Sequence, residues 1–394
     1  MTKEAGTTTE RVTGRLGQAA YLTAFALWAI VALLKYTFWR DKIPMTEISE
    51  IVQYIVLVLL LIKLVCDFPY DCRNLCGLFL LMLFMTIAYA GKKLPFAVMF
   101  ALIFAARGVD LKKILKLSFV LQLLVFGVTV LASQTGILQD YIWEEGTRYR
   151  HGLGFTHCML ASHFGLFLSV VYLAIVGKMT VLRALVIAAG NYILFRLTDG
   201  KTDFYLSILL IPLGFLFGNL GQKLKKEKLL GIMASVVPMF LLFFSYAVTK
   251  AYDAADPGWE RINQVFNNRL SLGNRALNQY GWNLFGHKIS WVGASSLYYD
   301  PTKVYNYVDN AFLMMLLTYG AVFIVCYCVG MGIVLYRHMA ARQTMLVTCL
   351  AVSLAFGMIN PQSMFLTYNP LLVLLAQVWN PAAGPREEKE KKDV

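Results

Sequence analysis

Apolar stretches of about 20 residues recur along almost the whole chain, and this recurrence constrains the fold more than any other feature. The hydrocarbon core of a bilayer is about 30 Å thick, so a helix needs about 20 apolar residues to cross it. Charged residues make up 15% of the 394 residues, whereas about a quarter is usual in soluble domains. We therefore expect an all-α, polytopic membrane protein that forms a single membrane domain over residues 1–394.

The hydropathy pattern predicts about twelve membrane-spanning helices. The first apolar run is too long for the apolar part of a signal peptide and lacks a small-residue cleavage site, so we interpret it as the first span. Only "GKK" separates the short third and fourth segments, which predicts a tight hairpin. The predicted spans are 19–38, 48–66, 75–90, 94–106, 117–138, 155–176, 181–197, 204–220, 229–248, 310–336, 343–359 and 364–379.

Lysine and arginine are concentrated in the loops "ARGVDLKKILK", "GQKLKKEK" and "YRHMAAR", which all fall on one side of the predicted topology. Because basic loops face the cytoplasm, this pattern predicts cytoplasmic N- and C-termini. The segment around Arg148 and the large loop 249–309 are then extracytoplasmic. In that loop Ile262, Phe266 and Leu270 recur at helical spacing, so we expect one or two amphipathic helices that cover the outer face and end near Gly281 or Gly286.

Basic residues are unexpectedly frequent in the segments predicted to lie outside, because outer loops are usually poor in arginine. The guanidinium group is planar and always charged, and it matches phosphate oxygens in a bidentate fork. We predict that these segments converge on an anion at the membrane surface, with a diphosphate as the natural ligand. Contact with lipid headgroups is the alternative. The candidate anion ligands are Arg148, Arg150, Arg196, Lys201, Arg269 and Arg275.

Histidine and aspartate supply the candidate proton-transfer groups. Asp309 precedes the span 310–336 and is either a general base or a helix cap. His157 begins its span and is either a second base or a partner of the backbone. His163 lies inside the same span, and we expect it to be a hydrogen-bonded packing residue. Spacing of six between these histidines does not suit one metal ion, so we predict no metal site.

The remaining candidate ligands suit a carbohydrate. Tyr280 and Trp282 can stack on sugar faces, and Asn310 can bond to hydroxyl groups, although aromatic residues of this kind also anchor proteins at the membrane interface. The net charge of +13 follows from membrane topology, so we do not expect nucleic acid as a partner.

Three motifs resemble those of Wzy-type bacterial capsule and exopolysaccharide (O-antigen) polymerases, a family related to O-antigen ligases. "YRHGLGFTH" resembles their segment "R-x-x-LGF-x-H", and "NNRLSLGNRALNQYGWNLFG" resembles their outer-loop pattern "R-x-x-x-G-x-x-A-L-x-x-Y…LFG". "VDNAFLMMLLTYG" resembles the pattern "DN-x-(Y/F)-L…L-x-x-YG" that follows. The motifs cover residues 148–320 in the family's order. The chain departs from the family at Cys158 and Met159, where "H-P-N" is usual, and at Lys201, where arginine is common.

The resemblance implies a multi-span glycosyltransferase of the GT-C type in the bacterial cytoplasmic membrane. Its substrates would be undecaprenyl-diphosphate-linked oligosaccharide repeat units on the outer leaflet, with the lipid diphosphate as leaving group. The phospho-sugar bond supplies the energy, so no cofactor is implied, and a flippase and a chain-length regulator are the candidate partners in the membrane. Within that chemistry Arg150, Arg269 and Arg275 would bind the diphosphate, Asp309 would be the first candidate base, and His157 the second.

Three alternative functions stay open at this point. An O-antigen-ligase-like transferase would share these residues and differ in its acceptor. A flippase for lipid-linked oligosaccharides would also have many spans, but transporters bind substrate near the bilayer midplane rather than at the outer mouth. A non-enzymatic assembly partner would not need this set of arginines.

Overall fold

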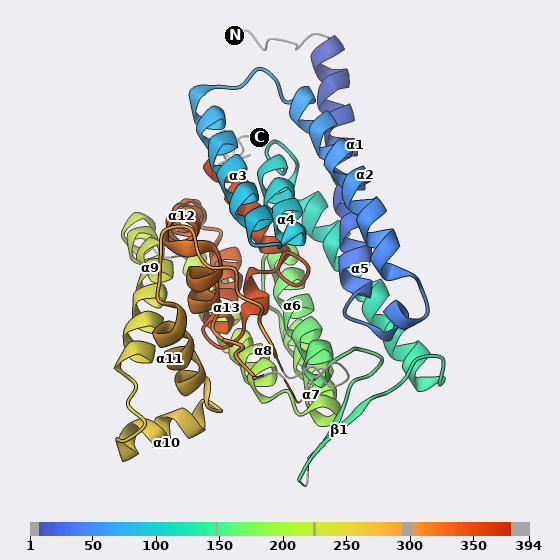
Figure 1. Ribbon diagram of the computed structural model, residues 1–394. Helices are drawn as coiled ribbons and strands as arrows, with labels where there is room; N and C mark the ends of the chain where they lie inside the picture. Colours follow the sequence, from blue (N-terminus) through green and yellow to red (C-terminus); the bar gives the residue numbers. More distant parts are fainter. Residues whose placement is uncertain (1–7, 147, 224–225, 294–301, 303, 380–394) are drawn as a thin grey trace.

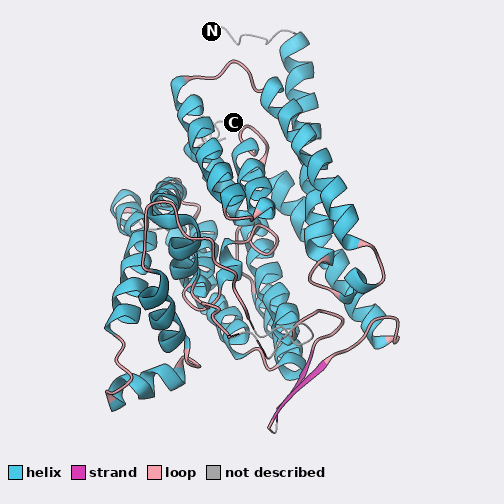
Figure 2. Cartoon of the chain, in the orientation of Figure 1, coloured by secondary structure: helices cyan, strands magenta, loops and turns pink. Residues whose placement is uncertain are grey.

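In a computed structural model of the protein, residues 8–146, 148–223, 226–293, 302 and 304–379 are described. The charged C-terminal tail that we predict to be cytoplasmic, and residues 294–301 and 303 of the large outer loop, lie outside these ranges. Within the ranges, Figure 2 shows helices throughout and one two-stranded hairpin.

Nine helices in the described part of the chain are long and apolar enough to cross a membrane, which supports the prediction of an all-α, multi-pass membrane protein. The predicted segments 94–106 and 343–359 are shorter helices, α4 (Leu94–Ala105) and α13 (Thr344–Gly357), of 12 and 14 residues. At 1.5 Å per residue both are shorter than the hydrocarbon core. Most of segment 364–379 is a 3-10 helix, η5 (Pro370–Val378). The nine long helices are α1 (Thr8–Leu34), α2 (Met45–Cys66), α3 (Cys72–Ala90), α5 (Leu111–Gln134), α6 (Cys158–Val176), α7 (Val181–Thr198), α8 (Lys201–Leu213, extended to Asn219 by a π-helix), α9 (Glu227–Ala251) and α12 (Ala311–Ala340).

Helices α6 and α12 form the centre of the bundle (Figure 1). They are apolar on all sides and largely buried, whereas α2 and α7 expose rows of leucine, isoleucine and valine. A helix that is apolar all round belongs in the interior, and a one-sided apolar surface on an outer helix suits lipid. The central packing is aromatic: Phe164, Phe167, Phe312, Phe356 and Tyr368 are fully buried.

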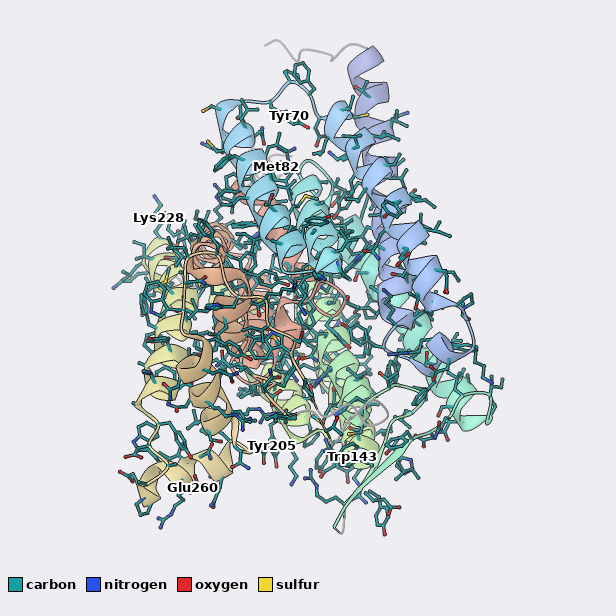
Figure 3. All side chains as sticks on the ribbon, in the orientation of Figure 1. Tyr70, Met82, Trp143, Tyr205, Lys228 and Glu260 are labelled. Atoms are coloured by element: carbon teal, nitrogen blue, oxygen red, sulfur yellow. The ribbon has the colours of Figure 1, made fainter. Side chains whose placement is uncertain are left out.

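The polar elements gather at one end of the bundle. Trp143 of the hairpin and Glu260 of α10 (Pro257–Val265) lie at this end, and Tyr70 lies at the opposite end, where α1 begins (Figures 1 and 3). This agrees with the prediction that the segment around Arg148 and the loop 249–309 lie on the same side. The assignment of that side to the outside of the cell stays a prediction.

The large loop contains two helices, as predicted from its amphipathic pattern. Asp256 caps α10 by accepting a hydrogen bond from Gly258 N at 2.6 Å. Helix α11 (Arg269–Tyr280) follows and ends at Gly281, which has a φ of 66°. Glycine adopts this left-handed conformation without steric cost, so the predicted end of the helix near Gly281 is confirmed.

Helix α12 is broken at Gly320, a feature that the hydropathy pattern did not predict. Gly320 has φ 87° and ψ 174°, and the loop 282–287 packs against the break. Ala321 N donates to Asn283 O at 2.8 Å, and His287 N donates to Leu317 O at 2.8 Å. The loop therefore satisfies backbone groups that the break releases, which a membrane environment requires. The predicted span 310–336 consists of two helical parts.

The segment around Arg148 forms a hairpin rather than a plain loop. Strand β1 (Ile142–Glu145) pairs antiparallel with β2 (Arg148–His151). The chain then turns and pairs with the end of α1, because Phe38 N donates to Gly154 O at 2.9 Å and Thr156 N donates to Tyr36 O at 3.0 Å. Gly154 has a φ of 81°, and a Cβ there would lie 2.9 Å from the carbonyl oxygen of Thr129. The "GLGF" motif thus fixes the hairpin to the helix bundle.

Candidate active site

Arg269 and Asp309 face each other where α11 and the start of α12 meet. Their Nε and Oδ2 atoms are 3.7 Å apart, and the two side chains are 22% and 25% exposed. This distance is too long for a hydrogen bond, and Arg269 Nε is buried without a hydrogen-bond partner among the described residues. A buried guanidinium donor without an acceptor is costly, so this arginine is suited to accept an anionic ligand.

Asn310, not Asp309, caps α12. Asn310 Oδ1 accepts from Leu313 N at 3.1 Å, and its Nδ2 donates to Met358 O at 2.9 Å and to Ser245 Oγ at 3.0 Å. The Asn310 side chain is therefore occupied in joining three elements, which disfavours the predicted role in sugar binding. The alternative interpretation of Asp309 as a cap is wrong, so its carboxylate is available for chemistry.

Burial raises the pKa of Asp309 above the ordinary aspartate value, while the positive charge of Arg269 opposes this rise. Tyr305 lies near the same carboxylate. Burial raises the pKa of Tyr305 to about 12, with a smaller contribution from Asp309. The Arg275 guanidinium donates to the carbonyl oxygen of Tyr305, so Arg275 holds this part of the loop close to the carboxylate. The Asp309 carboxylate thus has Arg269 beside it, and its pKa lies closer to neutral than is usual for aspartate.

A second polar group, centred on His163, is buried in the bundle. His163 Nδ1 and Asp203 Oδ1 are 2.7 Å apart, and Ser162 Oγ donates to the other carboxylate oxygen at 3.0 Å. His163 is 2% exposed and Asp203 is 1% exposed. The prediction that His163 is a hydrogen-bonded packing residue is confirmed. Its partners come from α8 and from the segment after α13, and sequence spacing gave no signal for either.

The geometry fits a neutral His163. Asn360 Oδ1 accepts from Gln362 N at 3.1 Å, which places the amide nitrogen of Asn360 toward His163 Nε2 at 2.9 Å. Nε2 then accepts, and Nδ1–H donates to Asp203. Both ring nitrogens have partners, and the ring packs edge-on against Phe356 with centroids 5.3 Å apart. In this arrangement His163 positions neighbouring groups.

The hairpin arginines are held by local acceptors at the end of α7. Arg148 forms an ion pair with Asp199, and Arg150 Nε donates to Thr198 O at 3.1 Å. The predicted ligands Arg196 and Lys201 lie exposed near the same corner. Figure 1 shows this corner and α11 on different sides of the bundle. The predicted basic ligands therefore lie in two groups, one at the hairpin corner and one at α11, and their binding of a single anion stays a prediction.

His157 is the N-cap of α6. Its Nδ1 accepts from Met159 N at 3.2 Å, which satisfies one backbone donor in the first turn of the helix. This is the backbone role that the sequence left open as the alternative to proton transfer, and it makes Asp309 the better candidate base.

The two predicted sugar-stacking residues differ in their surroundings. The Tyr280 ring lies 6.3 Å from Trp291 and 6.3 Å from His287, so it belongs to a packed aromatic group under α11. Trp282 is 57% exposed, at the start of the loop that meets the break in α12. Trp282 is therefore the one of the two whose ring is accessible to a ligand.

Within the described residues, no group of three or more histidine, cysteine, aspartate or glutamate side chains is placed to hold a metal ion. Comparisons with models of protein families, with curated proteins and with solved structures find no match to this chain.

Proposed function

We propose that this protein is a membrane glycosyltransferase that joins lipid-diphosphate-linked oligosaccharide units, as the resemblance to Wzy-type polymerases implies. The observation that carries the proposal is the pairing of Asp309 with Arg269, whose buried Nε lacks a hydrogen-bond partner among the described residues. A base beside an unsatisfied guanidinium is the minimum that transfer from a diphosphate requires.

The transfer step follows from these two groups. The acceptor hydroxyl gives its proton to the Asp309 carboxylate while its oxygen bonds to the anomeric carbon of the donor. The bond from that carbon to the diphosphate oxygen breaks, and the electron pair leaves with the lipid diphosphate. Arg269 and Arg275 stabilise the negative charge that develops there, and one well-placed donor contributes about 3–4 kcal/mol.

The hairpin arginines have a supporting role in this proposal. Arg148 and Arg150 hold Asp199 and Thr198 at the corner between α7 and α8. Asp203, the partner of His163, lies one turn after that corner in α8. The basic corner therefore positions the His163 group. Arg269, whose Nε lacks a partner among the described residues, is the first candidate diphosphate ligand, and Arg275, which the Tyr305 carbonyl holds, supports it.

The proposed function also implies a fold type, a membrane and an orientation for the protein. A GT-C-like bundle with the predicted twelve segments would count α4, α13 and η5 as short segments between the long helices. The protein would lie in the bacterial cytoplasmic membrane with both termini inside, and a flippase and a chain-length regulator would work beside it. The polar end that carries α10, α11 and the hairpin would then face outward.

The test replaces Arg269 by glutamine and uses Arg261→Gln on α10 as the matched control, because Arg261 is exposed and the charge change is identical. Both variants are expressed in the producing cells after deletion of the native copy. We expect Arg269→Gln to abolish polymer and to leave single lipid-linked repeats on the outer face, whereas Arg261→Gln makes normal polymer. Normal chain length with Arg269→Gln contradicts the proposal.

The broken helix favours one other function, a transporter of lipid-linked oligosaccharides. Discontinuous helices are typical of transporters, and Gly320 divides α12. The deletion strain separates the two functions: repeats trapped inside indicate transport, and single repeats outside indicate polymerisation. If the protein were an O-antigen-ligase-like transferase, the deletion strain would instead accumulate finished polymer that is not attached to its final acceptor.

A further inference from the structure

A cavity of about 320 Å³ lies between α1, α2 and α4. Its volume is at the lower end of the range of about 300–1,000 Å³ that is usual for ligand pockets. Lys35, Ser49 and Gln53 provide polar groups in its lining, and the rest is mainly apolar and aromatic, including Trp28 and Phe96. None of these residues has a role in the transfer step described above.

The polar groups of this cavity are incompletely satisfied. Lys35 Nζ donates to Ser49 Oγ, and no carboxylate of the described residues lies within 4.0 Å of it. Burial lowers the pKa of Lys35, and the charge of Glu50 only partly opposes this effect. Gln53 Nε2 donates to Ser49 O at 3.0 Å, but Gln53 Oε1 is buried without a hydrogen-bond partner among the described residues. Lys35 thus supplies a cation to the cavity lining, and Gln53 supplies a buried carbonyl acceptor next to it.

The arrangement of these groups matches a lipid with an anionic headgroup. Lys35 lies just beyond the end of α1, and Ala32 and Trp28 lie one and two turns further into the same helix on the same face. A phosphate suits Lys35 but offers mainly acceptors, whereas Gln53 Oε1 needs a donor. A sugar hydroxyl supplies that donor, so a phosphate with an attached sugar satisfies both groups.

The cavity is also close to the buried His163 group. Tyr36 lines it, and the Tyr36 ring lies 5.3 Å from the ring of Tyr368. The Tyr368 ring in turn lies 6.3 Å from the ring of His163. A glycan whose first sugar is held in the cavity therefore starts two aromatic rings away from His163.

We propose that this cavity binds the phosphate and first sugar of a second lipid-linked glycan, the acceptor, with Lys35 on the phosphate and Gln53 on a sugar hydroxyl. The inference rests on the proposed function, in which donor and acceptor are both lipid-linked. The donor diphosphate lies at Arg269 and the acceptor phosphate at Lys35, so the protein holds two lipid-linked molecules at once.

The experiment counts bound lipid by native mass spectrometry of the full chain from phosphatidylcholine nanodiscs. The probe is undecaprenyl diphosphate carrying one N-acetylglucosamine. We expect two bound molecules for the native protein, and Lys35→Gln to weaken one of them about tenfold or more, the effect of losing a charged hydrogen bond. Lys35→Arg keeps both molecules. Lys42→Gln is the matched control, since Lys42 is exposed nearby in the chain and does not line the cavity.

The outcomes separate this inference from the proposed function. Two molecules still bound by Lys35→Gln overturn the cavity site while leaving Arg269 untouched. Loss of one molecule in Lys35→Gln but none in Arg269→Gln supports the cavity and contradicts the donor site. Displacement of the Lys35-dependent molecule by phosphatidylglycerol shows a site for any anionic lipid and overturns the acceptor assignment. If inorganic diphosphate alone displaces the Lys35-dependent molecule, the cavity binds free phosphate groups, and its assignment to a lipid-linked ligand is overturned.

Discussion

Replacing Gly320 by alanine tests whether the break in α12 is built into the fold. The backbone there has φ 87° and ψ 174°, a region open almost only to glycine. A Cβ on Gly320 would lie 2.3 Å from the carbonyl oxygen of Leu284 and 2.4 Å from the amide nitrogen of Gly286. Real Cβ atoms do not approach backbone so closely, so the loop 282–287 must move away from the helix.

The loss in the free energy of unfolding can be estimated from the hydrogen bonds that this movement breaks. Three backbone hydrogen bonds join the loop to α12: Ala321 N to Asn283 O at 2.8 Å, Val322 N to Leu284 O at 3.2 Å, and His287 N to Leu317 O at 2.8 Å. At about 1 kcal/mol each, with about 1–3 kcal/mol of backbone strain, the loss is about 4–6 kcal/mol. That is a large part of the stability of a typical protein, about 5–15 kcal/mol.

The assay compares thermal unfolding in detergent with hydrogen exchange of residues 282–287. We expect Gly320→Ala to unfold at a markedly lower temperature and to exchange rapidly at His287. Gly127→Ala is the control, because a Cβ there meets no atom within 4 Å and alanine favours the helix. Equal unfolding temperatures for the two variants, with protected amides in the loop, would refute the reasoning.

Three further predictions concern the candidate site. Asp309→Asn should abolish polymer yet keep α12 folded, because Asn310 is the cap of that helix. Burial raises the pKa of Asp309, so its ionisation lowers the stability of the folded protein as the pH rises. At pH 7 the variant should therefore unfold at a temperature no lower than that of the native protein. His157→Ala should lower the free energy of unfolding by about 1 kcal/mol through loss of a cap and retain polymer synthesis; loss of polymer in a folded variant would restore His157 as the base. Asp203→Asn removes a carboxylate that accepts from the neutral His163 ring, so thermal unfolding should show a loss of about 1–3 kcal/mol in the free energy of unfolding; an unchanged unfolding temperature would contradict this pairing.

The apolar segments predicted most of the helices, because the length and hydropathy of a membrane-spanning helix are properties of its own residues. The long helices need only enough apolar residues to cross a bilayer, and their positions follow from the sequence. Helix α11 and its end at Gly281 were predicted for the same local reason. The short elements α4, α13 and η5 are as apolar as the long ones, so hydropathy could not show that they end or change form early.

Contacts distant in sequence could not be predicted in this way. His163 pairs with Asp203 and Asn360, which lie 40 and 197 residues away. Asp203 follows the start of α8 and looks like a helix cap in the sequence, but α8 has no side-chain cap at that position. The hairpin that carries Arg148 was missed because its strands are four residues each, too short for a periodic signal.

The glycines of two sequence motifs explain how the loop 282–287 packs against α12. "LFG" ends at Gly286 and "YG" ends at Gly320, and these glycines meet at the break in α12, where a Cβ on either would strike the backbone of the other segment. Arg275 and Asp309 lie in the segments that lead into this contact. The glycines therefore fix the loop and the start of α12 against each other, and that register keeps the arginines of α11 beside the carboxylate. A basic composition alone could not identify Arg269, because most basic residues near it in sequence are exposed. Arg269 differs in that folding buries its Nε beside Asp309 and gives it no hydrogen-bond acceptor among the described residues.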